Sequence, residues 1–279
     1  MVTGGRRLAQ RVSRALFIAI LLFGALVMMI PFAWSLSTAL KPLSLSMQFP
    51  PVWWPHPWVW SNFTEVFQTV PFARWFLNSF IVAASVTLGN LIIDSLAGYA
   101  LARIDFKGRT VLFIAIVAML MVPFQAVMLP VYLLLRALGL IDTYLGMILP
   151  AVVSSMGIFL MRQAFLNIPR ELDDAAIMDG CGRLRMFWQI AVPQVGPSLL
   201  TLALMIFVGS WNNFLLPLLV ANNPNLWTVQ LGIVQFQLQY QTNWPYLMAA
   251  GVMATVPIAV LFLIFQRRFV QGWTISGIQ

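Results

Sequence analysis

The amino-acid sequence predicts an all-helical integral membrane protein with six transmembrane helices, and three observations support this. Hydrophobic residues make up 61% of the 279 positions and charged residues only 9%, whereas soluble domains carry about 25% charged residues. Six apolar stretches approach or exceed the roughly 20 residues that a bilayer-spanning helix needs. The basic residues lie at the ends of these stretches, as membrane topology requires. The net charge of +8 therefore does not indicate nucleic-acid binding.

The predicted spans follow one another along the whole chain, which we interpret as a single domain of residues 1–279. They cover residues 15–36, 76–101, 111–135, 146–165, 197–220 and 247–266. The prolines within them include Pro123 and Pro130 in the third, Pro150 in the fourth and Pro217 in the fifth. Prolines are tolerated in spanning helices where neighbours or water satisfy the freed carbonyls, often beside a cavity.

The first span follows four arginines, as the apolar core of a signal peptide does. Its apolar run is longer than the roughly 7–15 residues of a cleaved signal, so we expect a retained first helix. With the N-terminus inside, thirteen of the sixteen Arg and Lys residues fall on the cytoplasmic side, and only Lys41, Arg74 and Arg136 fall outside. This positive-inside bias predicts that both termini are cytoplasmic.

The first outer loop, residues 37–75, is rich in tryptophan and proline. Its tryptophans are Trp53, Trp54, Trp58, Trp60 and Trp75. They fit an aromatic belt at the lipid headgroups and, equally well, a docking surface for an external protein. Both interpretations stay open.

The sequence offers no constellation for catalysis or for metal binding. It contains one cysteine, Cys181, and one histidine, His56, so neither a disulfide nor a Cys/His metal site is expected. No phosphate-binding loop or nucleophile elbow is present. We therefore expect no catalytic residue and no nucleotide bound by this chain.

A charged segment between the fourth and fifth spans, residues 167–193, holds half of the eight acidic residues. Pro169 is typical of a helix start, and the acidic side chains that follow complement the helix dipole. Asp179-Gly180 is typical of a helix end. A second helix is expected to place Leu184, Phe187, Trp188 and Ala191 on one apolar face.

This segment resembles the signature loop of binding-protein-dependent ABC importer permeases, whose pattern is Glu-Ala-Ala, three residues, Gly, about nine residues, and Ile-x-x-Pro. The matching residues are Asp174-Ala175-Ala176, Gly180, Ile190 and Pro193, with Asp174 in place of the usual Glu. Residues 78–80 with 96–103, and residues 211–214, resemble the second-span and fifth-span segments of carbohydrate-type permeases. Residues 266–272 are similar to the C-terminus of the shorter permease subunit of maltose-type importers.

The resemblance implies a type I six-span permease of a bacterial or archaeal cell membrane, with cytoplasmic coupling helices. Its implied partners are a second permease subunit, two cytoplasmic ATPase subunits that bind ATP and Mg²⁺, an extracytoplasmic solute-binding protein and membrane lipid. ATP hydrolysis would belong to the ATPase subunits, so the chain is not expected to be an enzyme. The residues expected to couple to the ATPase are Glu171, Asp174, Ala175, Ala176, Asp179 and Gly180.

The polar groups inside the predicted spans are mostly amides and hydroxyls. Arginine is the usual clamp for anions, but no arginine lies in the interior of a span, since Arg162 is close to the end of the fourth. This favours an uncharged sugar or oligosaccharide as the solute. The candidate pathway residues are Gln125, Trp211, Asn212 and Asn213, with Asn212 favoured. Interhelical hydrogen bonding is the alternative role for such amides.

Two alternatives to a carbohydrate importer remain at this stage. One is an ABC permease for a glycerol phosphate ester or a polyol. The other is an ion-coupled secondary transporter, which Asp94 inside the second span would serve as a proton relay. We favour a structural hydrogen-bonding role for Asp94, because no interior Lys, Glu or His accompanies it.

Overall fold

The computed structural model describes residues 3–238 and 242–274, and every regular element within these ranges is a helix. The residues up to Val70 and Ile233–Ala254 form one compact unit, here unit 1. Pro71–Gly232 and the residues from Thr255 onward form the other, here unit 2. Each unit is described by itself.

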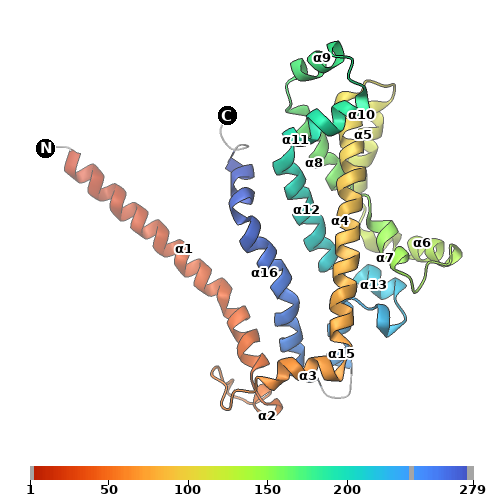
Figure 1. The fold of residues 1–279 in the computed structure, drawn as a ribbon. Coiled ribbons are helices and arrows are strands. Elements are labelled where there is room, and N and C mark those ends of the chain that lie inside the picture. Colours follow the sequence, from red (N-terminus) through yellow and green to blue (C-terminus); the bar gives the residue numbers. More distant parts are fainter. Residues whose placement is uncertain (1–2, 239–241, 275–279) are drawn as a thin grey trace. The chain divides into compact units, whose positions relative to one another are not determined.

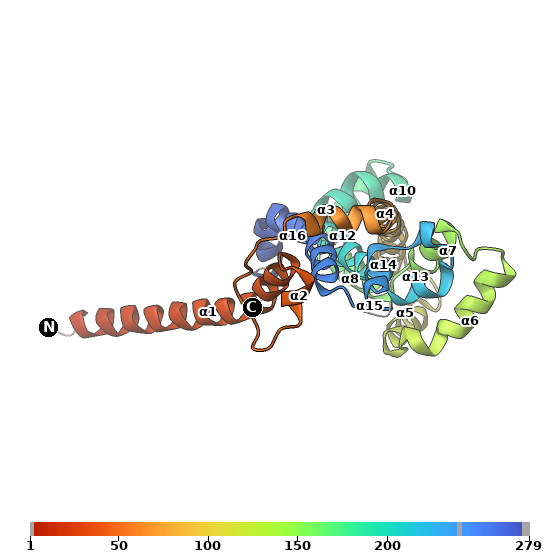
Figure 2. The same cartoon turned by 90° about the horizontal axis from the view of Figure 1, so that it is seen from below.

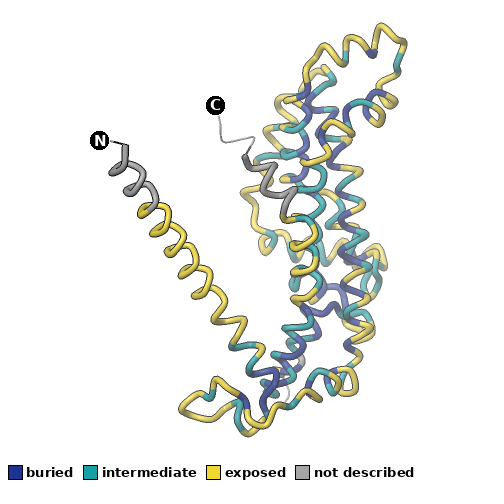
Figure 3. The backbone as a smooth tube through the Cα atoms, turned by 60° about the vertical axis from the view of Figure 1, so that its left-hand side comes forward, coloured by how far each residue is buried: buried dark blue, intermediate teal, exposed yellow. Residues whose placement is uncertain are grey.

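Unit 1 contains the long first helix and the short helices of the loop that follows it. Its elements are α1 (Thr3–Ala39), α2 (Leu43–Ser46), α3 (Ser61–Thr69), α15 (Gln235–Leu238) and the first part of α16 (Trp244–Thr274). Residues 12–39 of α1 are long and apolar enough to cross a membrane. Figure 3 shows this helix exposed over most of its length, so unit 1 by itself does not cover its apolar surface.

The C-terminal end of α1 is held by side chains of the tryptophan-rich loop and of α3. The Asn62 amide donates hydrogen bonds to the carbonyls of Ala39 (2.8 Å) and Lys41 (2.9 Å), which a helix end otherwise leaves unpaired. The Lys41 ammonium lies 3.9 Å from the Trp34 ring centroid, and burial lowers the pKa of Lys41. In the same unit the Tyr246 hydroxyl donates to Glu65, and this hydrogen bond holds the pKa of Glu65 below its ordinary value.

Unit 2 is built around α4 (Phe72–Arg103), which packs along α8 (Ser155–Leu166) and α12 (Gly196–Trp211) (Figure 1). The other helices of the membrane part are α5 (Arg109–Ala118), α6 (Phe124–Ala137), α7 (Tyr144–Ile148), α13 (Leu215–Val220) and α14 (Val229–Ile233). Three short 3₁₀ turns complete it: η1 (Met119–Met121), η2 (Leu149–Ala151) and η4 (Pro224–Leu226).

The third predicted span, residues 111–135, is not one straight helix. Helix α5 with η1 and helix α6 meet at an angle of 102°. Val122 is extended there and Pro123 is the N-cap residue of α6, as expected because the residue before a proline avoids the helical region. Figures 1 and 2 both show α6 at the edge of unit 2, farther from α4 than α7.

The fourth and fifth predicted spans are also interrupted. In place of one helix over 146–165, α7 with η2 and α8 meet at 45°. In place of one helix over 197–220, α12 ends at Trp211 and α13 begins at Leu215. Three helices, Val12–Ala39, Phe72–Arg103 and Trp244–Gln266, are long and apolar enough to span alone, and the described residues reach six spans only if each bent pair counts as one.

Two glycines allow α4 and α8 to approach closely. A Cβ at Gly98 would lie 2.8 Å from both the Met161 Cβ and the Arg162 backbone nitrogen, and a Cβ at Gly157 would overlap the Asp94 carboxylate. Small residues at helix contacts are a common way to bring membrane helices together. The chain therefore fixes α4 and α8 as one tightly packed pair.

We expect Gly98→Leu to destabilise unit 2, because the added side chain would push α4 away from α8. Overpacking of this kind costs about 1–3 kcal/mol, and the thermal midpoint of the purified full-length chain in detergent should fall by several degrees. Gly24→Leu is the matched control, since a Cβ at Gly24 meets nothing within 4 Å. Equal midpoints for the two variants would contradict the tight α4–α8 contact.

Candidate functional site

The acidic segment folds as the two short helices that the sequence predicts. Helix α9 (Arg170–Met178) begins directly after Pro169 and has Glu171 and Asp173 in its first turn. It ends in a Schellman motif: the N–H of Gly180 donates to the Ile177 carbonyl and that of Cys181 to the Ala176 carbonyl. Gly180 has a φ of +70°, which explains the glycine at this position.

Five of the six candidate coupling residues lie on the solvent side of this segment. Glu171, Asp174, Ala175, Asp179 and Gly180 are exposed. Ala176 is 5% exposed and packs inward. Figure 3 shows the α9 segment as exposed apart from short inward stretches.

Apolar side chains accompany the acidic ones on this exposed surface. Met178 is 87% exposed and Ile177 62% exposed. Large apolar side chains gathered in water mark an interaction site rather than an ordinary solvated loop. We call the exposed residues Glu171, Asp174, Ala175, Ile177, Met178 and Gly180 the α9 surface.

A buried arginine ties α9 to the membrane helices. The Arg103 guanidinium, at the end of α4, forms an ion pair with the Asp173 carboxylate at 2.9 Å. It also donates to the carbonyls of Phe165 (3.0 and 2.6 Å) and Ile168, at and just beyond the end of α8. Arg103 thus pairs with Asp173 of α9 and not with Asp94 of its own helix.

The second helix of the segment differs in part from its predicted apolar face. It consists of α10 (Arg183–Met186), a π-helical turn η3 (Phe187–Ala191) and α11 (Val192–Gln194). Phe187 and Ala191 are buried as predicted, whereas Leu184 is 66% and Trp188 50% exposed. The π turn adds one residue to the helical repeat and so rotates the side chains before and after it relative to each other.

Asp94 and Asn90 hold the break in the fourth span. The Asp94 carboxylate accepts a hydrogen bond from the Ser154 N–H at 3.1 Å, and the Asn90 amide donates to the Ala151 carbonyl at 2.7 Å. Among the described residues no basic side chain forms an ion pair with Asp94. This geometry favours the structural role of Asp94 over a proton relay.

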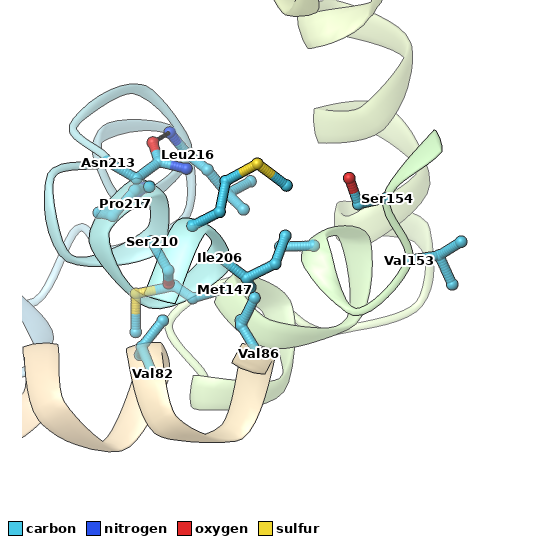
Figure 4. A pocket seen from close by; sticks show the side chains of 13 residues that line it. Val82, Val86, Met147, Val153, Ser154, Ile206, Ser210, Asn213, Leu216 and Pro217 are labelled. Atoms are coloured by element: carbon cyan, nitrogen blue, oxygen red, sulfur yellow. Dashed lines mark hydrogen bonds between the residues drawn. The ribbon is translucent and has the colours of Figure 1, made fainter. Parts of the chain in front are cut away.

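A cavity of about 270 Å³ lies between α4, the α7–α8 break and the α12–α13 break. Its polar lining consists of Ser154, Ser210 and Asn213, and the rest is apolar. Figure 4 shows Ser210 and Asn213 on one side of the cavity and Ser154 on the other. Hydroxyls and an amide offer hydrogen bonds to an uncharged polar solute but no compensation for a charge.

Of the four candidate pathway residues, the structure brings only Asn213 to this cavity. Trp211 is 1% exposed and packs against Phe76 and Phe207. Asn212 is exposed and its Oδ1 accepts a hydrogen bond from Gln230 at 3.2 Å. Gln125 is exposed in the first turn of α6. Their role in a pathway stays a prediction.

Within the described residues no group of three or more His, Cys, Asp or Glu side chains could hold a metal ion.

Three residues that were not among the predicted site residues belong to the two sites. Arg103 contacts the acidic segment, and Ser154 and Ser210 line the cavity. The signal available for Arg103 was its place at the end of a span, but its partner Asp173 lies 70 residues away.

Comparison with known proteins identifies the family of these elements. A family model described as "Binding-protein-dependent transport system inner membrane component" matches residues 94–275. The arabinooligosaccharides transport system permease protein AraQ of Halalkalibacterium halodurans is 40% identical over 219 residues, 78% of each chain. The sulfoquinovosyl glycerol transport system permease protein SmoH of Agrobacterium fabrum is 35% identical over 251 residues, 89% of this chain and 88% of the relative.

Two further similarities extend over most of the chain. The sn-glycerol-3-phosphate transport system permease protein UgpE of Yersinia pestis is 32% identical over 260 residues, 90% of this chain and 92% of the relative. A chain in the crystal structure of a bacterial ABC transporter for the import of alginate has a TM-score of 0.83 at 21% identity, covering 94% of this chain and 98% of that one. The chain therefore shares its fold with a chain of a solved bacterial ABC transporter.

We expect Arg103→Lys to loosen α9 although it keeps the charge, because a lysine lacks the planar fork that reaches Asp173 and the carbonyls together. Hydrogen bonds to charged groups contribute about 1.5–3 kcal/mol. Amide hydrogen exchange over residues 168–178 should therefore accelerate about tenfold, which corresponds to ~1.4 kcal/mol.

Arg109→Lys is the matched control for this variant. Arg109 pairs with Asp105, whose side chain is 81% exposed, and such a surface pair contributes about 0–1 kcal/mol. Unchanged exchange in Arg103→Lys, or equal acceleration in both variants, would show that the buried contacts do not anchor α9.

Proposed function

The chain belongs to the binding-protein-dependent transport system inner membrane components, and we propose that it forms half of the translocation pathway for a neutral sugar or oligosaccharide. It is a permease subunit of an ABC importer and not an enzyme. The observation that carries the proposal is the α9 surface, which is exposed and yet joined by Arg103 to two membrane helices.

We propose four protein partners for this subunit. A second permease subunit would supply the other half of the pathway, and two cytoplasmic ATPase subunits would bind ATP and Mg²⁺. An extracytoplasmic solute-binding protein would deliver the solute. The exposed α9 surface supports this division, because it offers apolar side chains that unit 2 does not cover itself.

The α9 surface is proposed to dock on the ATPase. Ala175 at its centre has a small side chain, so a partner can approach the α9 backbone closely. Closure of the ATPase pair would move α9, and the Arg103 contacts would pass this movement to α4 and α8 as a rigid-body displacement. A flexible connection at this point would dissipate the movement instead.

The proposed solute is uncharged because the cavity offers hydroxyls and an amide and no cation. The solutes in the name of AraQ are arabinooligosaccharides, which fit this chemistry. A glycerol phosphate ester is the second candidate, favoured by the similarity to UgpE. A phosphate would need an arginine or lysine from elsewhere in the complex.

We place both termini and α9 on the cytoplasmic side of the cell membrane, on the basis of the positive-inside bias. The tryptophan-rich loop then lies outside. In that loop Trp53, Trp54 and Trp60 are more than half exposed, which suits both an aromatic belt and a protein contact.

We expect Ala175→Trp to leave the fold and the pairing of permease subunits intact but to abolish solute-stimulated ATP hydrolysis. Ala175 is exposed, so the bulky ring creates no clash within the chain and interferes only with a partner on α9. Hydrolysis is measured on the complex reconstituted with its binding protein. Ala137→Trp, at an exposed alanine of α6, is the control and should behave as wild type. Full stimulation in Ala175→Trp would remove the α9 surface from the coupling mechanism.

The solute class is tested by a panel of loaded binding protein on the same reconstituted complex. We expect neutral oligosaccharides to stimulate hydrolysis and glycerol 3-phosphate to leave it at the basal rate. Ser210→Trp should block uptake by filling the cavity, whereas Ser210→Ala should retain it. Stimulation by glycerol 3-phosphate alone would establish the second candidate, and uptake driven by an ion gradient without ATP would contradict both.

A further inference from the structure

A second, largely apolar groove lies in unit 2 toward the end of α4 that also carries Arg103. It has a volume of about 320 Å³. Leu91 and Ile92 of α4, Phe187 and Trp188 of η3, and Leu199 and Ala203 of α12 contribute to its walls. The coupling residues and the cavity of Figure 4 are made of other side chains.

A buried hydroxyl without a partner faces this groove. Ser95 belongs to the groove lining and is only 2% exposed. Its Oγ has no hydrogen-bond partner among the described residues. An unpaired buried hydroxyl costs about 1–3 kcal/mol, so this position favours a ligand that brings a hydrogen-bond acceptor into a largely apolar space.

Two arginines precede the groove-lining turn on the same short helix. Arg183 and Arg185 are exposed, and they lie four and three residues before Phe187 and Trp188. Residues at these spacings are neighbours on a helix, so each arginine lies beside one groove-lining residue. Neither arginine forms an ion pair within the described part of the chain, although the Arg185 Nε donates to Gln189 at 2.8 Å.

The direction of this helix matches a membrane surface. The segment Arg183–Gln194 meets α12 at 83°, so it runs nearly at right angles to a helix that crosses the bilayer. Arginine heads at the polar edge of such a helix, above an apolar groove between spanning helices, are the recognised setting for anionic lipid headgroups.

We propose that this groove binds one anionic phospholipid. An acyl chain occupies the apolar groove, the phosphate contacts Arg183 and Arg185, and the Ser95 hydroxyl donates to an ester carbonyl. A neutral helix of another subunit would satisfy the apolar walls but would leave both arginines without a counter-charge and the Ser95 hydroxyl without an acceptor. The charge therefore favours the lipid, whichever solute the complex transports.

The lipid is tested by native mass spectrometry of the complete complex, purified in mixed micelles of phosphatidylglycerol and phosphatidylcholine. Wild type should retain phosphatidylglycerol selectively. Each arginine near a membrane surface contributes about a fivefold preference, so Arg183→Gln with Arg185→Gln should lower retention more than tenfold. Lys107→Gln removes one cytoplasmic charge outside the groove and should change nothing.

The groove itself is tested by filling it without any change of charge. Ala203→Trp should lower phosphatidylglycerol retention as strongly as the double arginine variant, whereas Ala126→Trp, at an exposed position of α6, should not. Loss in the arginine variant alone would mean a lipid held at the surface, and the proposal would be wrong. Ala203→Cys that crosslinks to the partner permease would overturn it as well, because a protein helix would then occupy the groove.

Discussion

The buried Arg103 guanidinium joins the acidic α9 segment to α4 and α8. A buried cation is stable only when its charge and its N–H groups are matched, and here Asp173 supplies the charge while the backbone carbonyls of Phe165 and Ile168 supply acceptors. The three partners belong to α9, to α8 and to the turn between them. Breaking any one of these contacts leaves a charge or a carbonyl without a partner where little water can reach it. The guanidinium and its three partners are therefore expected to stay together.

Helix α4 repeats this arrangement along its length, because its polar side chains meet backbone groups of irregular segments. Near its N-terminal end Asn78 donates to the carbonyls of Asn225 and Trp227. At the middle level Asn90 and Asp94 hold the break before α8. Broken helices within a membrane need such partners, since lipid offers none. The straight helix thus makes the bent ones possible.

The sequence predicted those features that depend on residues close together in the chain. Apolar stretches and the Pro169 start and Gly180 end of α9 depend on neighbours a few residues apart, and they correspond to features of the structure. Arg103–Asp173 and the cavity with Ser154 and Ser210 depend on residues 50 or more positions apart, and the 3.6-residue period carries no information about them. The 102° bend at Pro123 lies between these cases, because proline predicts a break but not its angle.

The two sides of the hydrogen bonds at the break in the fourth span are synthesised at different times. Asn90 and Asp94 leave the ribosome 61 and 60 residues before their partners Ala151 and Ser154, roughly 3–12 s earlier at translation rates of 5–20 residues per second. During that interval α4 must enter the bilayer with its carboxylate unpaired, at a cost of about 2.5–3.5 kcal/mol. The mean hydropathy of α4 is 1.8, against 2.7 for α1, which leaves a smaller margin for insertion. The contact that stabilises the finished protein is thus, during biogenesis, an obstacle to its insertion.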